Sequence, residues 1–315
     1  CMMERRKPTA YALPVLLLVL MLSGCSGLQQ SLHDAAISHE MSQAGLESDH
    51  IEIEAGRIEL LRGDNTGERE PLLLVHGFAA NNENWLRLSR YLHEDFYIVA
   101  PDLPGHGDSV QDPALSYRIP EQARRLDAMM EQLDIEQAHV AGNSMGGAIA
   151  AVFAAEFPDR VLSLGLINTA GIHQYPSKLD RLREQGKNPL IVKTHEDYDE
   201  LLDFVMEERP FIPWPISSVM AREAVANRQI NKQIFNDLLK DTDTDFAAIL
   251  SRIEVPALVL WGTEDRVINV RNASLVADAL PNSRLEIFEG IGHVPMIEAP
   301  ERTAKLIREL ASDTD

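Results

Sequence analysis

The chain has 315 residues, of which 45% are hydrophobic and 25% are charged, a composition typical of a globular protein with a sizeable core. Asp and Glu total 49 against 29 Lys and Arg, which gives a formal net charge of -20. This acidity argues against nucleic-acid binding and against adsorption to anionic headgroups, because both need a basic face. The two cysteines, Cys1 and Cys25, both lie near the start, which excludes a disulfide scaffold or a cysteine zinc site in the main body.

The first residues have the order of a secretory signal peptide. Glu4-Arg5-Arg6-Lys7 is net basic, residues 12–22 are almost wholly apolar, and Leu22-Ser23-Gly24-Cys25 follows. The apolar run is shorter than a comfortable membrane-spanning helix. The last four residues resemble the bacterial lipobox, which implies cleavage after Gly24 and lipidation of Cys25. A chance cysteine after an ordinary signal, or an uncleaved anchor, is the alternative.

We therefore expect residues 1–24 to be a signal peptide and residues 25–47 to be a lipidated, polar spacer that could contain a short helix. The expected protein is an exported bacterial lipoprotein anchored to a membrane. Ser26, rather than Asp, follows Cys25, which resembles outer-membrane sorting in diderm bacteria. An uncleaved inner-membrane anchor stays open as the other location.

The main body alternates strand-like and helix-like segments. Two short period-two segments around Ala55-Gly56-Arg57 predict a hairpin. The alternation of the remaining segments predicts a mostly parallel central sheet with helices on both faces. The expected strands are residues 72–75, 96–100, 139–141, 161–167, 257–260 and 285–288, and the expected helices are residues 120–133, 145–157 and 300–310.

Residues 171–245 interrupt this alternation, because they contain no strand-like run and are too many for a connecting loop. We interpret them as an inserted helical cap between two parts of one core, residues 48–170 and 246–315. The apolar stretch Phe211-Ile212-Pro213-Trp214-Pro215-Ile216 lies within the cap. It could line an acyl-chain channel under a mobile lid, or it could simply attach the cap to the core.

The motif Gly142-Asn143-Ser144-Met145-Gly146 lies between a predicted strand and a predicted helix rich in small residues. That context is the one a nucleophile elbow requires, because the tight turn needs small residues two before and two after the serine. Ser144 is therefore the candidate nucleophile. The backbone N–H of Met145, at the start of the helix, is a candidate donor to a developing oxyanion.

A serine hydroxyl needs a base, and His293 is the candidate, because it lies in a glycine-containing loop after the last predicted strand. Asp265 follows the strand 257–260 and could orient the imidazole, with Glu264 as the competing carboxylate. The order Ser144, Asp265, His293 is the chain order of the triad in α/β-hydrolases.

A second oxyanion donor is expected in His76-Gly77-Phe78, which directly follows the strand 72–75. Gly77 allows the backbone to approach closely, and the N–H of Phe78 is the candidate donor. His76 is interpreted as a brace for this loop through hydrogen bonds rather than as a participant in the chemistry.

These motifs, together with residues 101–109 and Trp261-Gly262-Thr263-Glu264-Asp265, resemble the α/β-hydrolase superfamily over roughly residues 48–312. The resemblance implies an α/β-hydrolase fold and a serine triad. The elbow and residues 120–126 resemble, more narrowly, a branch of bacterial membrane-associated lipases and esterases. That branch commonly has His-Gly-Phe-Gly, whereas this chain has Ala79 at the fourth position.

No metal ion and no cofactor is expected. Asp102, His106 and Asp108 are close together in the sequence, but the Gly and Pro residues around them indicate a turn held by aspartate hydrogen bonds. No other run of ligands supports a metal site there.

The resulting hypothesis is a serine carboxylic ester hydrolase of lipase, esterase or phospholipase type, which acts through an acyl-enzyme on lipid or small-molecule esters. One alternative is carbon–carbon bond hydrolysis or cofactor-free perhydrolysis on the same triad; a carboxylate substrate would favour a basic cap site such as Arg181, Arg183 and Lys187. The other is a noncatalytic membrane-tethered binding protein on the same scaffold. The sequence leaves the oligomeric state open.

Overall fold

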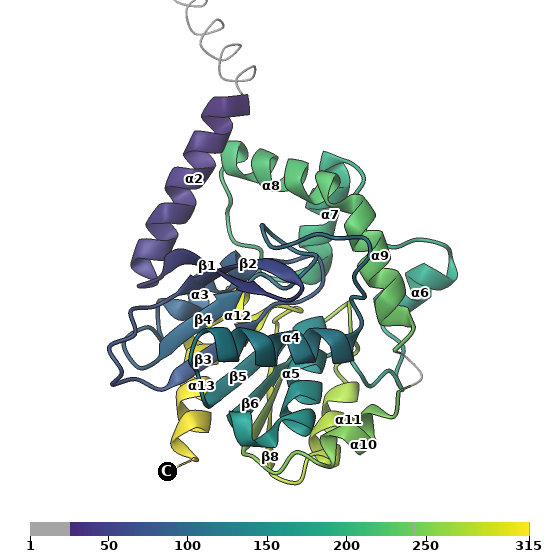
Figure 1. The fold of residues 1–315 in the computed structure, drawn as a ribbon. Helices are drawn as coiled ribbons and strands as arrows, with labels where there is room; N and C mark the ends of the chain where they lie inside the picture. Colours follow the sequence, from purple (N-terminus) through teal and green to yellow (C-terminus); the bar gives the residue numbers. More distant parts are fainter. Residues whose placement is uncertain (1–25, 242–243, 315) are drawn as a thin grey trace, which may run out of the picture.

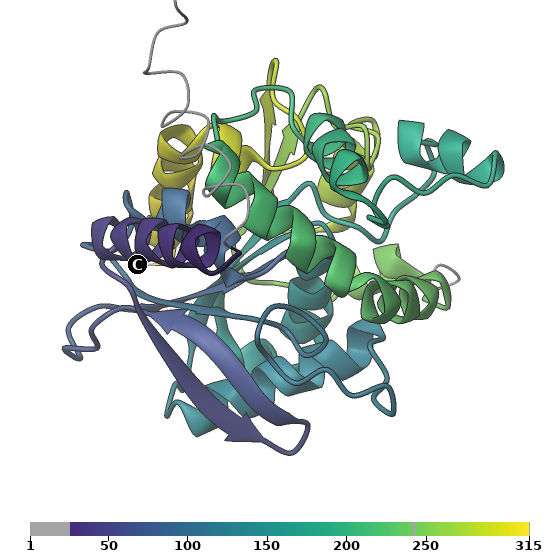
Figure 2. The same cartoon turned by 90° about the horizontal axis from the view of Figure 1, so that it is seen from above.

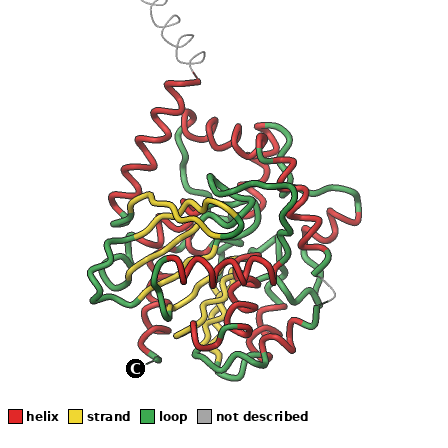
Figure 3. Tube along the Cα trace, in the orientation of Figure 1, coloured by secondary structure: helices red, strands yellow, loops and turns green. Residues whose placement is uncertain are grey.

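A computed structural model of the protein describes residues 26–241 and 244–314. One sheet of eight strands has the order β1-β2-β4-β3-β5-β6-β7-β8, and helices enclose it (Figures 1 and 3). Strands β3 to β8 pair in parallel, while β1 and β2 form an antiparallel hairpin whose second strand joins β4. The predicted fold class is confirmed. The strands are β1 (Glu47–Ile53), β2 (Gly56–Arg62), β3 (Pro71–Val75), β4 (Tyr97–Pro101), β5 (Ala138–Asn143), β6 (Val161–Ile167), β7 (Ala257–Gly262) and β8 (Ser283–Phe288).

The central strands are buried on both faces, which explains their nearly continuous apolar sequences. In β3, Leu73 and Val75 face one hydrophobic core, and Leu72 and Leu74 face the other. The helices that cover the first core are α4 (Ile119–Gln132), α5 (Met145–Glu156), α10 (Phe246–Leu250) and α11 (Asn272–Ala279). The second core is covered by α3 (Leu86–Ser89), α12 (Pro295–Glu298) and α13 (Pro300–Ser312), and two 3-10 turns are η1 (Asn82–Trp85) and η2 (Pro158–Arg160).

Four helices lie within residues 171–241, and no strand lies among the described residues between β6 and β7. Strands β6 and β7 are nevertheless parallel neighbours, as the sequence allowed. Ser177 and Thr194 begin two of these helices with capping boxes, which fix where each helix starts. The four helices are α6 (Lys178–Glu184), α7 (His195–Val205), α8 (Trp214–Ala226) and α9 (Arg228–Leu239).

Most of the segment that is expected to be a spacer forms the helix α2 (Ser26–Gln43). This helix lies beside α8 of the cap (Figure 2), and Gln29 and His33 on its inner side are buried. Arg222 of α8 donates from Nη1 to Gln29 Oε1 at 2.7 Å. The packing partner is distant in sequence and the contacts are polar, so hydropathy alone could not show that the segment docks.

The predicted signal peptide, residues 1–24, and the predicted lipidation site Cys25 lie outside the described residues. Among residues 26–241 and 244–314, no helix is both long and apolar enough to cross a membrane.

Candidate active site

Ser144 lies at the turn between β5 and α5, at the carboxyl edge of the sheet. Its backbone has φ 56° and ψ -119°, a strained conformation for a non-glycine residue and the one expected of a nucleophile elbow. The Ser144 N–H donates to the Ile167 carbonyl at 3.0 Å, which ties the turn to β6. The side chain is half-buried and lies at the junction of two cavities.

Two glycines make this turn possible by allowing backbone atoms to touch. A Cβ on Gly142 would lie 2.2 Å from the Gly146 carbonyl oxygen, and a Cβ on Gly146 would lie 2.1 Å from the Val75 carbonyl oxygen. Both distances are far inside van der Waals contact with backbone atoms that cannot move aside. The spacing of small residues around Ser144 is therefore a steric requirement.

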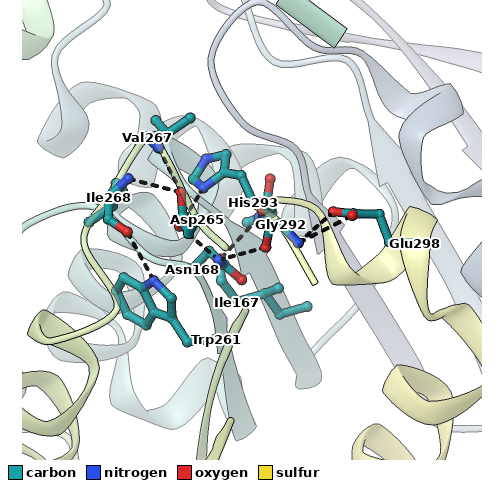
Figure 4. Close-up of polar contacts among 10 residues, drawn as sticks. Ile167, Asn168, Trp261, Asp265, Val267, Ile268, Gly292, His293 and Glu298 are labelled. Carbon is teal, nitrogen blue, oxygen red and sulfur yellow. Dashed lines mark hydrogen bonds and ion pairs between the residues drawn. The ribbon is translucent and has the colours of Figure 1, made fainter. Parts of the chain in front are cut away.

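His293 and Asp265 are hydrogen-bonded at the same edge of the sheet. His293 Nδ1 lies 2.8 Å from Asp265 Oδ2, and both side chains are buried (Figure 4). Because the carboxylate accepts, Nδ1 carries the hydrogen and Nε2 is left with its lone pair, as a general base requires. Glu264, the competing carboxylate, instead lies against the hydroxyl of Thr263.

Asp265 is held by three further donors that the sequence analysis did not identify. Its Oδ1 accepts the N–H groups of Val267 and Ile268 at 2.8 and 3.0 Å, and its Oδ2 accepts Asn168 Nδ2 at 2.8 Å (Figure 4). Asn168 follows directly after β6. A polar residue at the carboxyl end of a buried strand was the available signal for it.

The backbone of the histidine loop is also held from the elbow and from the cap. Asn143, the residue before the candidate nucleophile, donates from Nδ2 to the His293 carbonyl at 3.0 Å. The His293 N–H donates to the carbonyl of Val205, the last residue of α7, at 2.8 Å. The imidazole is therefore positioned by the catalytic core and by the cap together.

Both candidate oxyanion donors lie beside Ser144. Met145 is the first residue of α5, so its N–H has no acceptor within the helix. The N–H of Phe78 has no acceptor among the described residues. A Cβ on Gly77 would approach Ser144 Cβ to 3.2 Å, which shows how closely this loop passes the serine. Ala79 has φ 54°, a conformation that favours glycine, which explains the glycine in the related motif.

His76 braces the oxyanion loop, as predicted. Its Nε2 accepts the Leu103 N–H at 3.0 Å, and its Nδ1 donates to the Gly77 carbonyl at 2.8 Å. Complete burial lowers the pKa of the His76 imidazole to about 4, so the ring is neutral at pH 7. His76 therefore supports the loop without serving as a base.

Asp102 closes the neighbouring turn by accepting backbone N–H groups, as the glycines and prolines around it indicated. Its two oxygens accept from Asn82 at 2.7 Å and from Asp108 at 3.0 Å. Burial raises the pKa of the Asp102 carboxyl to about 7 despite these two donors. Among residues 26–241 and 244–314, no cluster of three or more His, Cys, Asp and Glu could hold a metal ion.

Two cavities of about 320 Å³ each meet at Ser144, and Phe78 lines both. The cavity that we call the Met145 cavity runs along α5 and is lined by Met145, Ala148 and Val152. The other, the His293 cavity, is lined by His293, by the end of α7 and by residues 210–213, which precede α8. Both walls are mainly apolar, and both volumes are within the range of small-molecule sites.

The basic residues considered for a carboxylate substrate do not form a cluster. Arg181 and Lys187 are exposed, and only Arg183 lines a cavity. The Arg183 guanidinium lies over the Phe235 ring at 5.1 Å from its centroid, and Asp180 is within 3.9 Å of it. The cap therefore offers one partly neutralised cation rather than a basic site.

A buried His–Asp pair, a serine on a strained strand-to-helix turn and two free N–H groups define the machinery of a serine hydrolase. The family model for the alpha/beta hydrolase fold matches residues 70–189 and 227–300. The chain therefore belongs to the α/β-hydrolase fold family.

Similar proteins include Lipase 1 of Psychrobacter immobilis, 32% identical over 292 residues, which are 90% of this chain and 92% of that protein. Lipase 3 of Moraxella sp. (strain TA144) is 34% identical over 271 residues, 85% of each chain. A crystal structure described as a membrane phospholipase A, a novel bacterial virulence factor, is 37% identical and has a TM-score of 0.89. The match covers 96% of this chain and 98% of that one. The protein is an ester-hydrolysing serine hydrolase that resembles bacterial lipases.

Proposed function

We propose that this protein is a membrane-tethered carboxylic ester hydrolase that acts on lipid esters through an acyl-enzyme. The observation that carries the proposal is the position of Ser144, which lies beside the hydrogen-bonded His293–Asp265 pair and opens onto two apolar cavities. Apolar walls around a nucleophile suit a substrate with hydrocarbon chains. The lipases and the phospholipase to which the chain is similar support the same substrate class.

The proposed reaction has two halves. Ser144 Oγ attacks the ester carbonyl while His293 Nε2 takes its proton, and the N–H groups of Phe78 and Met145 bind the oxyanion. The imidazolium, stabilised by Asp265, then protonates the leaving alcohol, and an acyl-serine remains. Water attacks this acyl group in the same way, with His293 as the base, and releases the carboxylic acid.

The test is hydrolysis of p-nitrophenyl esters with two to sixteen acyl carbons, with Ser144→Ala as the reference. We expect Ser144-dependent turnover with a preference for medium or long chains, and a loss of several orders of magnitude in Ser144→Ala. Activity confined to the shortest esters would indicate a general esterase. The absence of any Ser144-dependent ester hydrolysis would contradict the proposal and favour carbon–carbon hydrolysis or perhydrolysis.

A fluorophosphonate probe separates the enzyme from a noncatalytic binding protein on the same scaffold. We expect covalent labelling of the native chain and none of Ser144→Ala, because only an activated serine reacts quickly. An unlabelled native chain would favour the binding protein.

We further propose that residues 1–24 are a cleaved signal peptide and that lipid on Cys25 tethers the enzyme to a bacterial membrane, the outer membrane in a diderm host. Residues 25–47 would link the lipid to the enzyme, and residues 171–245 would form a cap over the core residues 48–170 and 246–315. Metabolic labelling with an alkyne fatty acid, followed by membrane fractionation, tests the tether. We expect label on the native chain and none on Cys25→Ala; an unlabelled membrane-bound native chain would indicate an uncleaved anchor.

A further inference from the structure

The triad and the oxyanion donors give the two cavities different roles. In the tetrahedral intermediate, the oxyanion points to the N–H groups of Phe78 and Met145. The leaving oxygen must lie within hydrogen-bond reach of His293 Nε2, because that nitrogen protonates it. The alcohol therefore leaves on the His293 side, and the acyl chain extends on the other side of the carbonyl carbon.

Only one of the two cavities is lined by His293. The Met145 cavity contacts Ser144 and Met145 but not His293. The His293 cavity contacts Ser144 and His293, and two more residues of the histidine loop and α12, Val294 and Ile297, line it. The acyl chain therefore fits the Met145 cavity, and the leaving alcohol fits the His293 cavity.

The alcohol side is as large as the acyl side and is apolar over most of its wall. Its volume of about 320 Å³ equals that of the Met145 cavity. The cap supplies aliphatic and thioether side chains to this wall, Leu201 and Leu202 from α7 and Ile216 and Met220 from α8. A small polar alcohol would leave these side chains in contact with water, at a cost for each apolar group left uncovered.

The outer part of the His293 cavity lies between α2 and the segment before α8. Ala36 and Ile37 of α2 line it, and so does Phe211, whose side chain is 87% exposed. α2 lies beside α8 (Figure 2), so side chains from two distant parts of the chain line the same cavity. A chain that entered beside Ser144 would meet a wall that is mostly hydrocarbon, although Glu40, Glu83 and Arg87 also line this cavity.

From this geometry we infer that the preferred substrate carries a long hydrocarbon chain on its leaving alcohol as well as on its acyl group. A glycerolipid that keeps a second acyl chain after cleavage and an ester of a long-chain alcohol share this chemistry. The inference rests on the proposed ester hydrolysis and extends it. The apolar stretch at residues 211–216, considered as an acyl channel from the sequence alone, is thereby assigned to the alcohol.

The test compares two matched ester series. Octanoate esters of methanol, butanol, octanol and dodecanol vary the alcohol, and methyl esters of butyric, octanoic and dodecanoic acid vary the acyl chain. We expect kcat/KM of the native enzyme to rise with alcohol length by up to roughly fourfold per methylene until the cavity is filled. A flat or falling dependence on alcohol length, with normal Ser144-dependent hydrolysis of methyl esters, would overturn the inference alone.

Two variants assign the cavities. Met220→Trp fills the His293 cavity, and Leu238→Trp, its matched control, fills the Met145 cavity. We expect Met220→Trp to lower the ratio of kcat/KM for dodecyl octanoate to kcat/KM for methyl octanoate at least tenfold. Leu238→Trp should lower the ratio of kcat/KM for methyl dodecanoate to kcat/KM for methyl butyrate and leave the ratio for the two alcohols within twofold. If Met220→Trp impaired the esters with long acyl chains and Leu238→Trp impaired the esters with long alcohols, the assignment of the cavities would be overturned. Leu201→Trp replaces Met220→Trp if thermal melting shows that Met220→Trp does not fold.

The source of the second chain is then decided with dioctanoylglycerol, dioctanoyl phosphatidylcholine and dodecyl octanoate. A preference for either glycerolipid identifies a lyso-type leaving group, and a preference for dodecyl octanoate identifies a long-chain alcohol. If methyl octanoate had the highest kcat/KM of all these substrates, neither a lyso-type leaving group nor a long-chain alcohol would be the preferred leaving group, and the inference would be overturned. The absence of Ser144-dependent hydrolysis of every ester would instead overturn the proposed function, and this inference with it.

Discussion

The Asn168 amide donates to Asp265 Oδ2 at 2.8 Å, and the same oxygen accepts from His293 Nδ1 at 2.8 Å. Asn168 itself has φ 47°, a left-handed conformation that asparagine tolerates better than most residues. The amide thus fixes the orientation of the carboxylate that in turn fixes the imidazole. Asn168 contacts no reacting atom and acts through Asp265.

Asn168→Gly removes this donor without adding backbone strain, because glycine accepts a positive φ freely. We expect kcat to fall roughly 10- to 100-fold, the equivalent of losing one hydrogen bond to a charged group. Steady-state kinetics on a p-nitrophenyl ester measures it. Asn282→Gly, at an exposed position before β8, is the control. A kcat within twofold of the native value would show that the backbone donors suffice to hold Asp265.

Gly146→Ala should destabilise the protein, whereas Gly27→Ala should not. The added methyl at position 146 would lie 2.1 Å from the Val75 carbonyl oxygen, so we expect a loss of about 3 kcal/mol or more in the free energy of unfolding. A Cβ at position 27, in α2, would meet nothing within 4 Å, so Gly27→Ala should be neutral or gain up to about 1 kcal/mol. Urea unfolding of both variants tests the pair, and equal stabilities would contradict the steric argument.

What could be predicted from the sequence depended on how local the cause was. The elbow was visible because Gly142 and Gly146 contact each other within a few residues, and the other contacts of the turn are with the two strands beside β5, β3 and β6. The docking of α2 was not visible, because Gln29 meets Arg222, which lies 193 residues further along the chain. Asn168 was missed for the same reason, since its partner Asp265 is 97 residues away and a single amide carries no periodic pattern.

The cavities show a second limit of prediction from the sequence. Apolar residues in the cap were evident, but their division between an acyl side and an alcohol side depends on which of them reach His293. Hydrophobicity has no direction, so it could not assign a channel. The triad order in the chain, in contrast, follows from the strand order and was available from the motifs.

The stability of the enzyme should depend on pH through His76. Its folded-state pKa is lowered by burial to about 4, below the unfolded value of about 6.5, so between these values only the unfolded chain binds the proton. The stability that depends on neutral His76 is therefore fully present above pH 6.5 and is lost as the pH falls toward 4. The loss in the free energy of unfolding is roughly 3 kcal/mol at most. His106, also buried, has its pKa lowered in the same direction and adds to the slope.

We expect the free energy of unfolding of the native protein, measured relative to that of His76→Gln, to fall between pH 6.5 and pH 4, because the opposing contribution of Asp102 is common to both proteins. The glutamine can still accept the Leu103 N–H but cannot be protonated in this range. Urea titrations at pH 4.5, 5.5 and 6.5 give the two slopes. His195→Gln, at an exposed position at the start of α7, is the control. Identical slopes for the native protein and His76→Gln would remove His76 as the cause.

Glu298 joins the cap to the loop that carries His293. Its Oε2 accepts the N–H groups of Glu207 and Glu208 at 2.8 and 2.9 Å, just after α7, and its Oε1 accepts the Gly292 N–H at 3.1 Å. On the neighbouring loop, Arg266 donates to the Met206 carbonyl at 3.2 Å. The end of α7 is thus attached to both loops that hold the His–Asp pair, so a shift of the cap end would displace the imidazole.

Glu298→Gln should therefore lower kcat about tenfold with little change in KM, because the amide keeps one acceptor oxygen and presents a donor to the other N–H groups. Kinetics on a short ester, which needs little of either cavity, isolates this effect from substrate binding. Glu301→Gln, at an exposed position on α13, should leave kcat and melting temperature unchanged. If Glu298→Gln lowers the melting temperature but leaves kcat at the native value, the carboxylate stabilises the cap and has no part in placing His293.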